Sequence, residues 1–119
     1  MIEKGWGRII TLGGISWHSG FKHRAHNLTA KSGLVGLTRA LAAEFRDRGI
    51  TANCIAPGQI EIVRPASAGE RPPMTSPPPV PRMGEVDEIA SAAMFLAHPQ
   101  QRCINGQIIH VNGGIYMGT

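Results

Sequence analysis

Three histidines near the start of the chain are of a type and spacing that could do chemistry. His18, His23 and His26 stand five and three residues apart, which resembles the spacing of short-range metal ligands. An imidazole can also transfer protons near neutral pH. No carboxylate or cysteine lies beside these histidines. We therefore expect no metal site here, and we interpret the three histidines as solvated loop residues.

Lys31 is the second candidate for chemistry. Asn27 stands four residues before it, and side chains at i and i+4 share one face of a helix. An amide does not titrate, so Asn27 cannot act as a general acid or base. The only tyrosine, Tyr116, lies near the C-terminus. Lys31 therefore has no proton-transfer group one helical turn away.

The elements that position these residues follow from apolar patterns. Short apolar runs bounded by turn residues predict buried strands at 8–12, 50–56 and 107–111. Residues 13–26, rich in Gly, Ser and His, are typical of a loop. Helical spacing predicts one helix from Asn27 to Arg48, with Gly49 as a left-handed cap, and another from Glu85 to Ala97.

The first predicted helix carries two stripes. The two stripes indicate a helix that is covered on two sides, by a sheet and by another helix. The apolar stripe consists of Leu34, Leu37, Leu41 and Phe45. The small-residue stripe consists of Gly33, Gly36, Ala40 and Ala43. The second helix has an apolar face made of Val86, Ile89, Ala93 and Leu96.

Residues 59–83 hold seven of the nine prolines. Proline removes backbone donors and fixes φ, so this stretch is predicted to be irregular. A loop of this length in a small domain is usually a lid, a binding loop or a disordered segment.

The element order is β-α-β-long loop-α-β, which predicts an α/β fold with a parallel sheet in one domain, residues 1–119. Such a sheet normally needs both faces covered, and two helices are few for that purpose. We therefore expect part of a larger α/β architecture.

Composition excludes several functions. Of the 119 residues, 42% are hydrophobic, and the net charge is +4. The basic residues are scattered and do not interleave with aromatics, which argues against nucleic-acid binding. No apolar run approaches the roughly 18 residues that span a bilayer, and no signal-peptide pattern is present, so we expect a cytoplasmic protein without membrane contact. We expect Cys54 and Cys103 to be buried free thiols.

Five blocks, in this order, carry a family resemblance: GWGRIITLGG, KSGLVGLTRALAAEF, RGITANCIAPGQIE, PRMGEVDEIASAAMFLA and INGQIIHVNGG. They resemble the C-terminal half of a short-chain dehydrogenase/reductase, most closely the 3-oxoacyl-(acyl carrier protein) reductase type. The resemblance covers the chain apart from the proline-rich loop. It implies half of a Rossmann-like, doubly wound sheet.

The resemblance also implies a catalytic set of Ser, Tyr and Lys. Lys31 matches the family lysine, Asn27 stands at the tyrosine position, and Gly14 stands at the serine position. We expect catalysis to be lost. Ser16 and His26 lie near the missing groups and remain candidates for a rescue.

NAD or NADP is the cofactor implied by the resemblance. Lys31 and the turn Pro57, Gly58 and Ile60 match cofactor-contacting positions, whereas Ile62 replaces a threonine that many members carry. The glycine-rich phosphate-binding turn belongs to the N-terminal half, so we expect this chain alone not to bind the cofactor.

We therefore expect a catalytically silent, truncated dehydrogenase-like module that works through association. Its partner would be a second copy or an intact short-chain dehydrogenase subunit. An alternative is part of an active NAD(P)-dependent oxidoreductase that reduces a carbonyl or oxidises an alcohol. A third alternative is a binding module that presents the PPPVP segment, residues 77–81, to an aromatic groove. The sequence leaves open the substrate, the choice of cofactor and whether Met1 is the native start.

Overall fold

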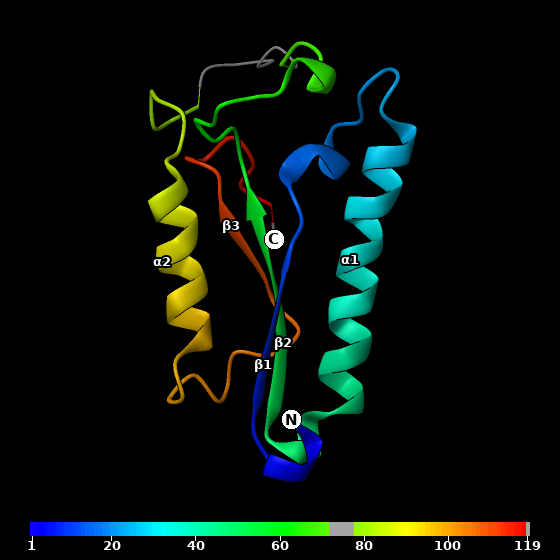
Figure 1. Cartoon of the computed structure of the whole chain (residues 1–119), viewed down its shortest axis with the longest axis vertical. Coiled ribbons are helices and arrows are strands. Elements are labelled where there is room, and N and C mark those ends of the chain that lie inside the picture. Colours follow the sequence, from blue (N-terminus) through cyan, green and yellow to red (C-terminus); the bar gives the residue numbers. More distant parts are fainter. Residues whose placement is uncertain (72–77, 119) are drawn as a thin grey trace.

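A parallel sheet lies between two helices. In the computed structural model, which describes residues 1–71 and 78–118, the sheet has three strands, β1 (Gly7–Leu12), β2 (Ile50–Pro57) and β3 (Ile108–Val111), in the order β1-β2-β3. Helices α1 (Ala25–Glu44) and α2 (Val86–Ala97) lie on opposite sides of it (Figure 1). The α/β class and the parallel sheet are confirmed.

The central strand β2 forms the core. It pairs with β1 from Ile50 to Ile55 and with β3 from Cys54 to Pro57. Residues 50–56 are all buried, because neighbouring strands flank them and helices cover both faces. This explains why the segment consists of apolar and small residues apart from Asn53.

Two asparagines complete the sheet where β3 does not reach. Asn53 donates from Nδ2 to the Ile104 carbonyl at 2.8 Å and accepts from the Gln107 amide at 3.0 Å. Asn105 accepts from the Ala52 amide at 2.9 Å and donates to the Ala42 carbonyl of α1 at 3.0 Å. These bonds satisfy buried backbone groups beside β2.

The long helix differs from its prediction at both ends. It begins at Ala25, two residues early, and ends at Glu44. A short 3-10 helix follows at Arg46–Arg48, and Gly49 then takes the expected left-handed conformation with φ 67°. A side chain at Gly49 would collide with the Gly5 carbonyl, so glycine is required there on two grounds.

The buried face of α1 also differs from its prediction. Its buried residues are Thr38 and Ala42, and the Thr38 hydroxyl lies 2.9 Å from that of Thr11 on β1. Leu37, expected on the apolar face, is 47% exposed. The small-residue stripe Gly33, Gly36, Ala40 and Ala43 is exposed as well. The buried positions of α1 are therefore Thr38 and Ala42, and the cover by another helix that the sequence indicates for the small-residue stripe stays a prediction.

Helix α2 begins as the sequence indicates. Glu85 is its N-cap and forms a capping box with Glu88. Leu96 is 1% exposed and anchors the inner face, whereas Val86, predicted for the same face, is 56% exposed. Val86 is the first residue of the helix, and its prediction for the inner face was wrong.

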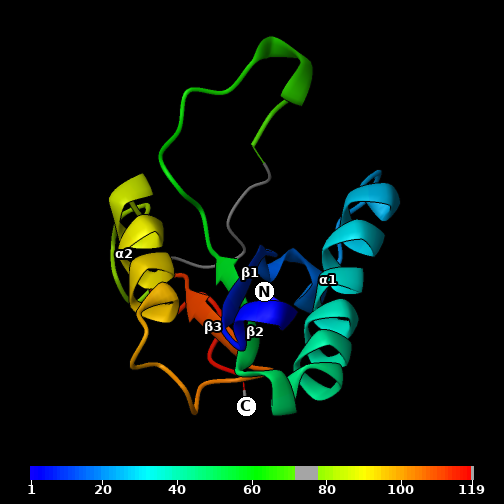
Figure 2. The ribbon, with the colours of Figure 1, turned by 60° about the horizontal axis from the view of Figure 1, so that its bottom comes forward.

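The predicted irregular segment begins at the end of β2, and its described part 59–71 extends away from the sheet (Figure 2). It contains a 3-10 turn at Ala66–Ala68. Its two stems pair with each other through a bridge between Ile60 and Gly84. Pro77, the first residue of the PPPVP segment, lies outside the described residues.

The two cysteines differ in environment. Both are free thiols, and Cys54 is buried as expected, but Cys103 is exposed because it lies in the loop after α2. Within the described part of the chain, no helix combines the length and the apolar character needed to cross a membrane.

Candidate active site

A cavity of about 350 Å³ lies where β1 and β2 end. The carboxyl ends of parallel strands are the usual ligand site of open α/β sheets. The cavity is lined by residues of the β1–α1 connection, the loop after β2 and the C-terminal segment: Gly14, Ile15, Ser16, Ser19, Phe21, Pro57, Gly58, Gln59, Ile60, Ile62, Arg64, Arg71 and Ile115. Gly14, Pro57, Gly58 and Ile60, four of the predicted site residues, therefore come together. Their functional roles stay a prediction.

The two glycines after β1 differ in the space around them. A side-chain Cβ at Gly13 would lie 2.6 Å from the Trp17 ring and 3.0 Å from the Cys54 sulfur. At Gly14 the nearest atom would be the Ser16 hydroxyl, 3.9 Å away, and the backbone is extended, with φ 161° and ψ 159°. Glycine is thus sterically required at position 13 and not at position 14.

The turn after β2 is held against the end of β3. The Gly58 amide donates to the Val111 carbonyl at 3.0 Å, and a side chain at Gly58 would lie 2.8 Å from the Cα of Asn112. Asn112 is buried and bonds to the Gly114 amide and the Tyr116 carbonyl. This wall of the cavity therefore consists of the turn after β2 and the turn after β3, which these hydrogen bonds and close contacts hold together.

Lys31 contacts the end of β1. Its Nζ donates to the Leu12 carbonyl at 2.8 Å. Asn27, one turn earlier on α1, is half-buried. Neither residue belongs to the cavity wall, so the structure separates this helix pair from the four residues named above. His26 is exposed on α1, whereas Ser16 lies in the wall.

A ring cluster beyond the cavity contains His18, which is exposed as expected. His18 belongs to a 3-10 helix, Ile15–His18, and is not a simple loop residue. Its ring stacks on Tyr116 with centroids 3.5 Å apart and planes 13° apart, and His110 lies 5.5 Å from it. Burial, and then the nearby His110, lower the pKa of His18, while burial lowers the pKa of His110. The pair therefore favours neutral imidazoles.

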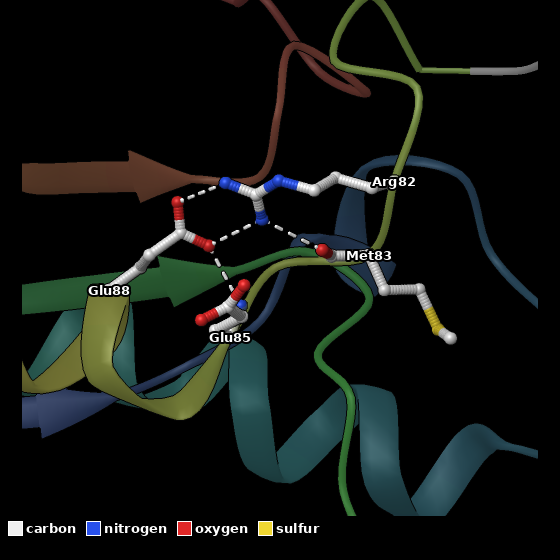
Figure 3. A network of polar contacts seen from close by, with 4 residues as sticks. All are labelled: Arg82, Met83, Glu85 and Glu88. Atoms are coloured by element: carbon white, nitrogen blue, oxygen red, sulfur yellow. Dashed lines mark hydrogen bonds and ion pairs between the residues drawn. The ribbon is translucent and has the colours of Figure 1, made fainter.

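The residues that precede α2 are joined to it by an ion pair between Arg82 and Glu88. Figure 3 shows Arg82 facing Glu88, with two bonds of 2.9 Å between them, and Glu88 also accepting from the Glu85 amide at 2.7 Å. The hydrogen bonds from Arg82, and then from the Glu85 backbone, lower the pKa of Glu88 to about 2. Arg82 also donates to the Met83 carbonyl, so one guanidinium joins these residues to the start of α2.

Two arginines of the loop after β2, Arg64 and Arg71, line the cavity, and sequence reasoning missed both. Arg64 donates to the Ala68 and Gly69 carbonyls, and Arg71 donates to the Ile60 carbonyl. Arg24, which precedes α1, donates to the Glu70 carbonyl at 3.3 Å. This bond joins the loop after β2 to the start of α1. The only signal of Arg64 and Arg71 in the sequence is basic charge within a proline-rich loop.

A metal centre has no support in the described residues, where no group of three or more His, Cys, Asp or Glu side chains could hold an ion. His18 is directed to a tyrosine, and His23 and His26 are exposed.

Comparison with known proteins decides the family. A family model described as enoyl-(acyl carrier protein) reductase matches residues 1–116. The chain belongs to the short-chain dehydrogenase/reductase family. The resemblance in the five sequence blocks is thereby confirmed.

Relatives of this short-chain dehydrogenase/reductase chain are reductases of acyl carrier protein substrates by name. The 3-oxoacyl-[acyl-carrier-protein] reductase FabG of Salmonella typhimurium is 43% identical over 119 residues, and that of Escherichia coli (strain K12) is 42% identical. Each match covers 98% of this chain and 49% of the relative. The chain thus spans about half the length of these relatives.

A solved structure described as a betaketoacyl-ACP reductase has the same fold. Its TM-score to this chain is 0.81 at 29% sequence identity, and the match covers 96% of this chain and 48% of the other. The Rossmann-like architecture is confirmed.

Proposed function

We propose that this chain is a catalytically silent short-chain dehydrogenase/reductase module. The observation that carries the proposal is Asn27, one helical turn before Lys31. An amide there can neither give nor take the proton that carbonyl reduction requires. Gly14 removes a second polar group from the cavity wall. The two losses affect proton transfer and substrate polarisation together.

The residues present fit a nicotinamide cofactor only in part. The Pro57–Gly58 turn and Ile60 line the cavity, but the Lys31 ammonium is bonded to the Leu12 carbonyl. No strand-to-helix connection of this chain carries the G-x-G-x-x-G spacing that binds a dinucleotide pyrophosphate. We therefore propose that these 119 residues alone, as one partial Rossmann-like domain with a lid at 59–83, bind neither NAD nor NADP.

Association with another chain is the role that remains. The exposed stripe of Gly33, Gly36, Ala40 and Ala43 offers α1 a close helix contact. Strand β1 is an edge of the described sheet, and unpaired edges favour association. A second copy or an intact subunit of the family would serve as the partner.

One observation favours the alternative of an active oxidoreductase assembled from two chains. The Ser16 hydroxyl lies 3.9 Å from the position that a Gly14 Cβ would occupy. Ser16 could therefore polarise a substrate oxygen in place of a serine at position 14. His26, the candidate proton donor, is exposed and outside the cavity wall, which makes this alternative the weaker one.

A complementation assay tests the proposal. The Salmonella typhimurium relative supplies the half that the match leaves uncovered, and NADPH-dependent reduction of a 3-oxoacyl thioester is measured. The relative's own matched half, added back in trans, is the positive control. We expect turnover with that control and none above background with this chain. Turnover of the same order with both halves would refute the silent assignment and make Ser16 and His26 the residues to replace.

A further inference from the structure

The cavity at the carboxyl ends of the strands combines an apolar wall with two positive charges. Ile15, Phe21, Ile60, Ile62 and Ile115 line it, and Arg64 and Arg71, from the loop after β2, belong to the same lining. No acidic side chain belongs to the described lining. A cavity of about 350 Å³ with this division is of the size that holds small amphipathic ligands.

The two guanidinium groups are fixed in place by bonds that do not neutralise them. Arg64 donates from Nη2 to the Ala68 carbonyl at 2.9 Å and the Gly69 carbonyl at 3.1 Å. Arg71 donates from Nη1 to the Ile60 carbonyl at 3.0 Å and contacts the Met83 sulfur at 3.0 Å. All four partners are uncharged, and the ion pairs of the described residues involve other arginines, Arg46 and Arg82.

Each guanidinium keeps donors for a ligand. An arginine has five N–H groups, and the contacts within the described chain engage one terminal nitrogen of Arg64 and one of Arg71. An anchored guanidinium has already lost much of its side-chain freedom, so less entropy is lost when an anion binds. Half-burial beside apolar side chains also strengthens its attraction for an anion relative to bulk water.

We propose that the cavity binds an aliphatic carboxylate, with its carboxylate on Arg64 and Arg71 and its methylene chain against the isoleucines and Phe21. A carboxylate matches the planar fork of a guanidinium. A neutral chain of the same length would leave both positive charges uncompensated, and a cation would be repelled. Binding does not require Asn27 or Lys31, so the inference goes beyond the proposed function and stands whether or not the chain supports turnover.

A pair of matched ligands tests the proposal without any mutation. Octanoate and octanol have the same chain and differ in the charged head, and their affinities for the 119-residue chain are compared by titration calorimetry at low salt. We expect octanoate to bind at least about tenfold more tightly, which corresponds to one charge-assisted hydrogen bond retained in the complex. Equal affinities, or no octanoate binding, would overturn the proposal.

Variants then assign the site. Arg64→Gln and Arg71→Gln should each lower the octanoate affinity by about tenfold and leave that of octanol unchanged. Arg48→Gln is the charge-matched control, because Arg48 is exposed near the other end of the sheet. Loss of octanoate preference in the Arg48 variant, or its survival in both lid variants, would show nonspecific charge attraction and contradict the site.

The test of carboxylate binding and the test of catalytic silence can fail independently of each other. Carboxylate binding is measured in the isolated chain without nucleotide, whereas silence is measured by turnover in the complemented fold. Circular dichroism on each variant establishes that the lid substitutions leave the fold intact, and octanol binding provides an internal check on the cavity itself.

Discussion

The Nζ of Lys31 donates a hydrogen bond to the carbonyl oxygen of Leu12 at 2.8 Å, joining the second turn of α1 to the last residue of β1. The bond lies at the carboxyl end of β1. The pairing of β1 with β2 ends at Leu12 and Ile55, so the strand ladder supplies no partner beyond that pair. Lys31 thus has a structural role that is independent of catalysis, which explains how the lysine can persist without a tyrosine before it.

Lys31→Met should therefore destabilise the chain even though no catalysis is proposed. The change leaves the Leu12 carbonyl without its donor, and we expect a loss of about 1 kcal/mol in the free energy of unfolding. Urea denaturation measures it. Lys22→Met, at an exposed loop position, is the control and should be neutral. An unchanged midpoint for Lys31→Met would mean that the bond contributes nothing to stability.

Restoring the catalytic pair should restore chemistry only in a complete fold. Asn27→Tyr places a phenol one helical turn before Lys31, whose charge would lower the phenol pKa. Gly14→Ser is sterically accommodated, because its Cβ would meet nothing closer than 3.9 Å and the backbone is extended. We expect carbonyl reduction by the double variant with the complementary half, and none by the isolated double variant. If the complemented double variant is inactive while the relative's own half is active, other lost groups must matter more.

Gly36→Leu should weaken self-association without unfolding the chain. Gly36 is exposed, and a Cβ there would have nothing within 4 Å, so the isolated fold tolerates the change. A partner helix packed on the stripe would be pushed away, and we expect association at least about tenfold weaker by analytical ultracentrifugation. Lys22→Leu is the control and should leave the assembly unchanged. A wild-type chain that is monomeric at micromolar concentration would contradict the role of the stripe.

The ring cluster should make stability depend on pH. The pKa values of His18 and His110 lie below 6.5 in the fold, so the unfolded state binds more protons below pH 6.5. Their contribution is therefore fully present above pH 6.5 and is lost as pH falls through the lowered pKa values. His18, His110 and Arg39 line one small cavity. The positive charge of Arg39 therefore lies near either imidazole when that imidazole is protonated.

Thermal unfolding between about pH 7.5 and about pH 5.5 measures this dependence. His110→Gln should flatten the curve, because it removes one titrating ring and the charge that faces His18. His98→Gln, at an exposed position, serves as the matched control. The same slope in the His110 variant and the wild type would assign the pH effect to other groups.

Loss of the ion pair between Arg82 and Glu88 should loosen the contact between the residues before α2 and the start of that helix. Arg82→Gln removes both bonds to Glu88 and the bond to the Met83 carbonyl, so we expect faster hydrogen exchange at the Glu85 and Glu61 amides. Glu61 reports on the lid because its amide donates to the Gly84 carbonyl at 2.8 Å. Arg46→Gln, which removes a looser exposed pair with Asp47 at 3.7 Å, should leave both amides unaffected. Unchanged exchange in the Arg82 variant would show that the bridge between Ile60 and Gly84 holds the lid unaided.

The sequence predicted the strands well because each is a short apolar run that ends in, or is followed within two residues by, glycine or proline. The second helix was equally clear, since Glu85 and Glu88 form the capping box that their spacing indicates. The start of α1 was missed because its N-cap, Arg24, makes no capping bond from its side chain. The exposure of Leu37 was missed because helical periodicity does not reveal that the sheet contacts Thr38, whose partner Thr11 lies 27 residues away.

The site was predictable only where it follows a local motif. Gly14, Pro57, Gly58 and Ile60 come together because each lies at, or just after, the end of a parallel strand. Arg64 and Arg71 depend on the path of the lid, which proline content does not specify. The stacking of His18 on Tyr116 joins opposite ends of the chain, and no short-range pattern signals such a contact.

The asparagine bonds beside β2 have a consequence for how the chain reaches its structure. Asn53 and its neighbour Ala52 are bonded to residues 51 to 54 positions later, and β2 becomes the middle of the sheet only when β3 arrives from the far end of the chain. Contacts between such distant residues slow folding, because a long loop must close before they form. On a ribosome, the strand Ile50–Pro57 would emerge with one edge unsatisfied and would stay so until residue 111 had been synthesised. The waiting period exposes the most buried strand of the described sheet, which makes it accessible to a chaperone.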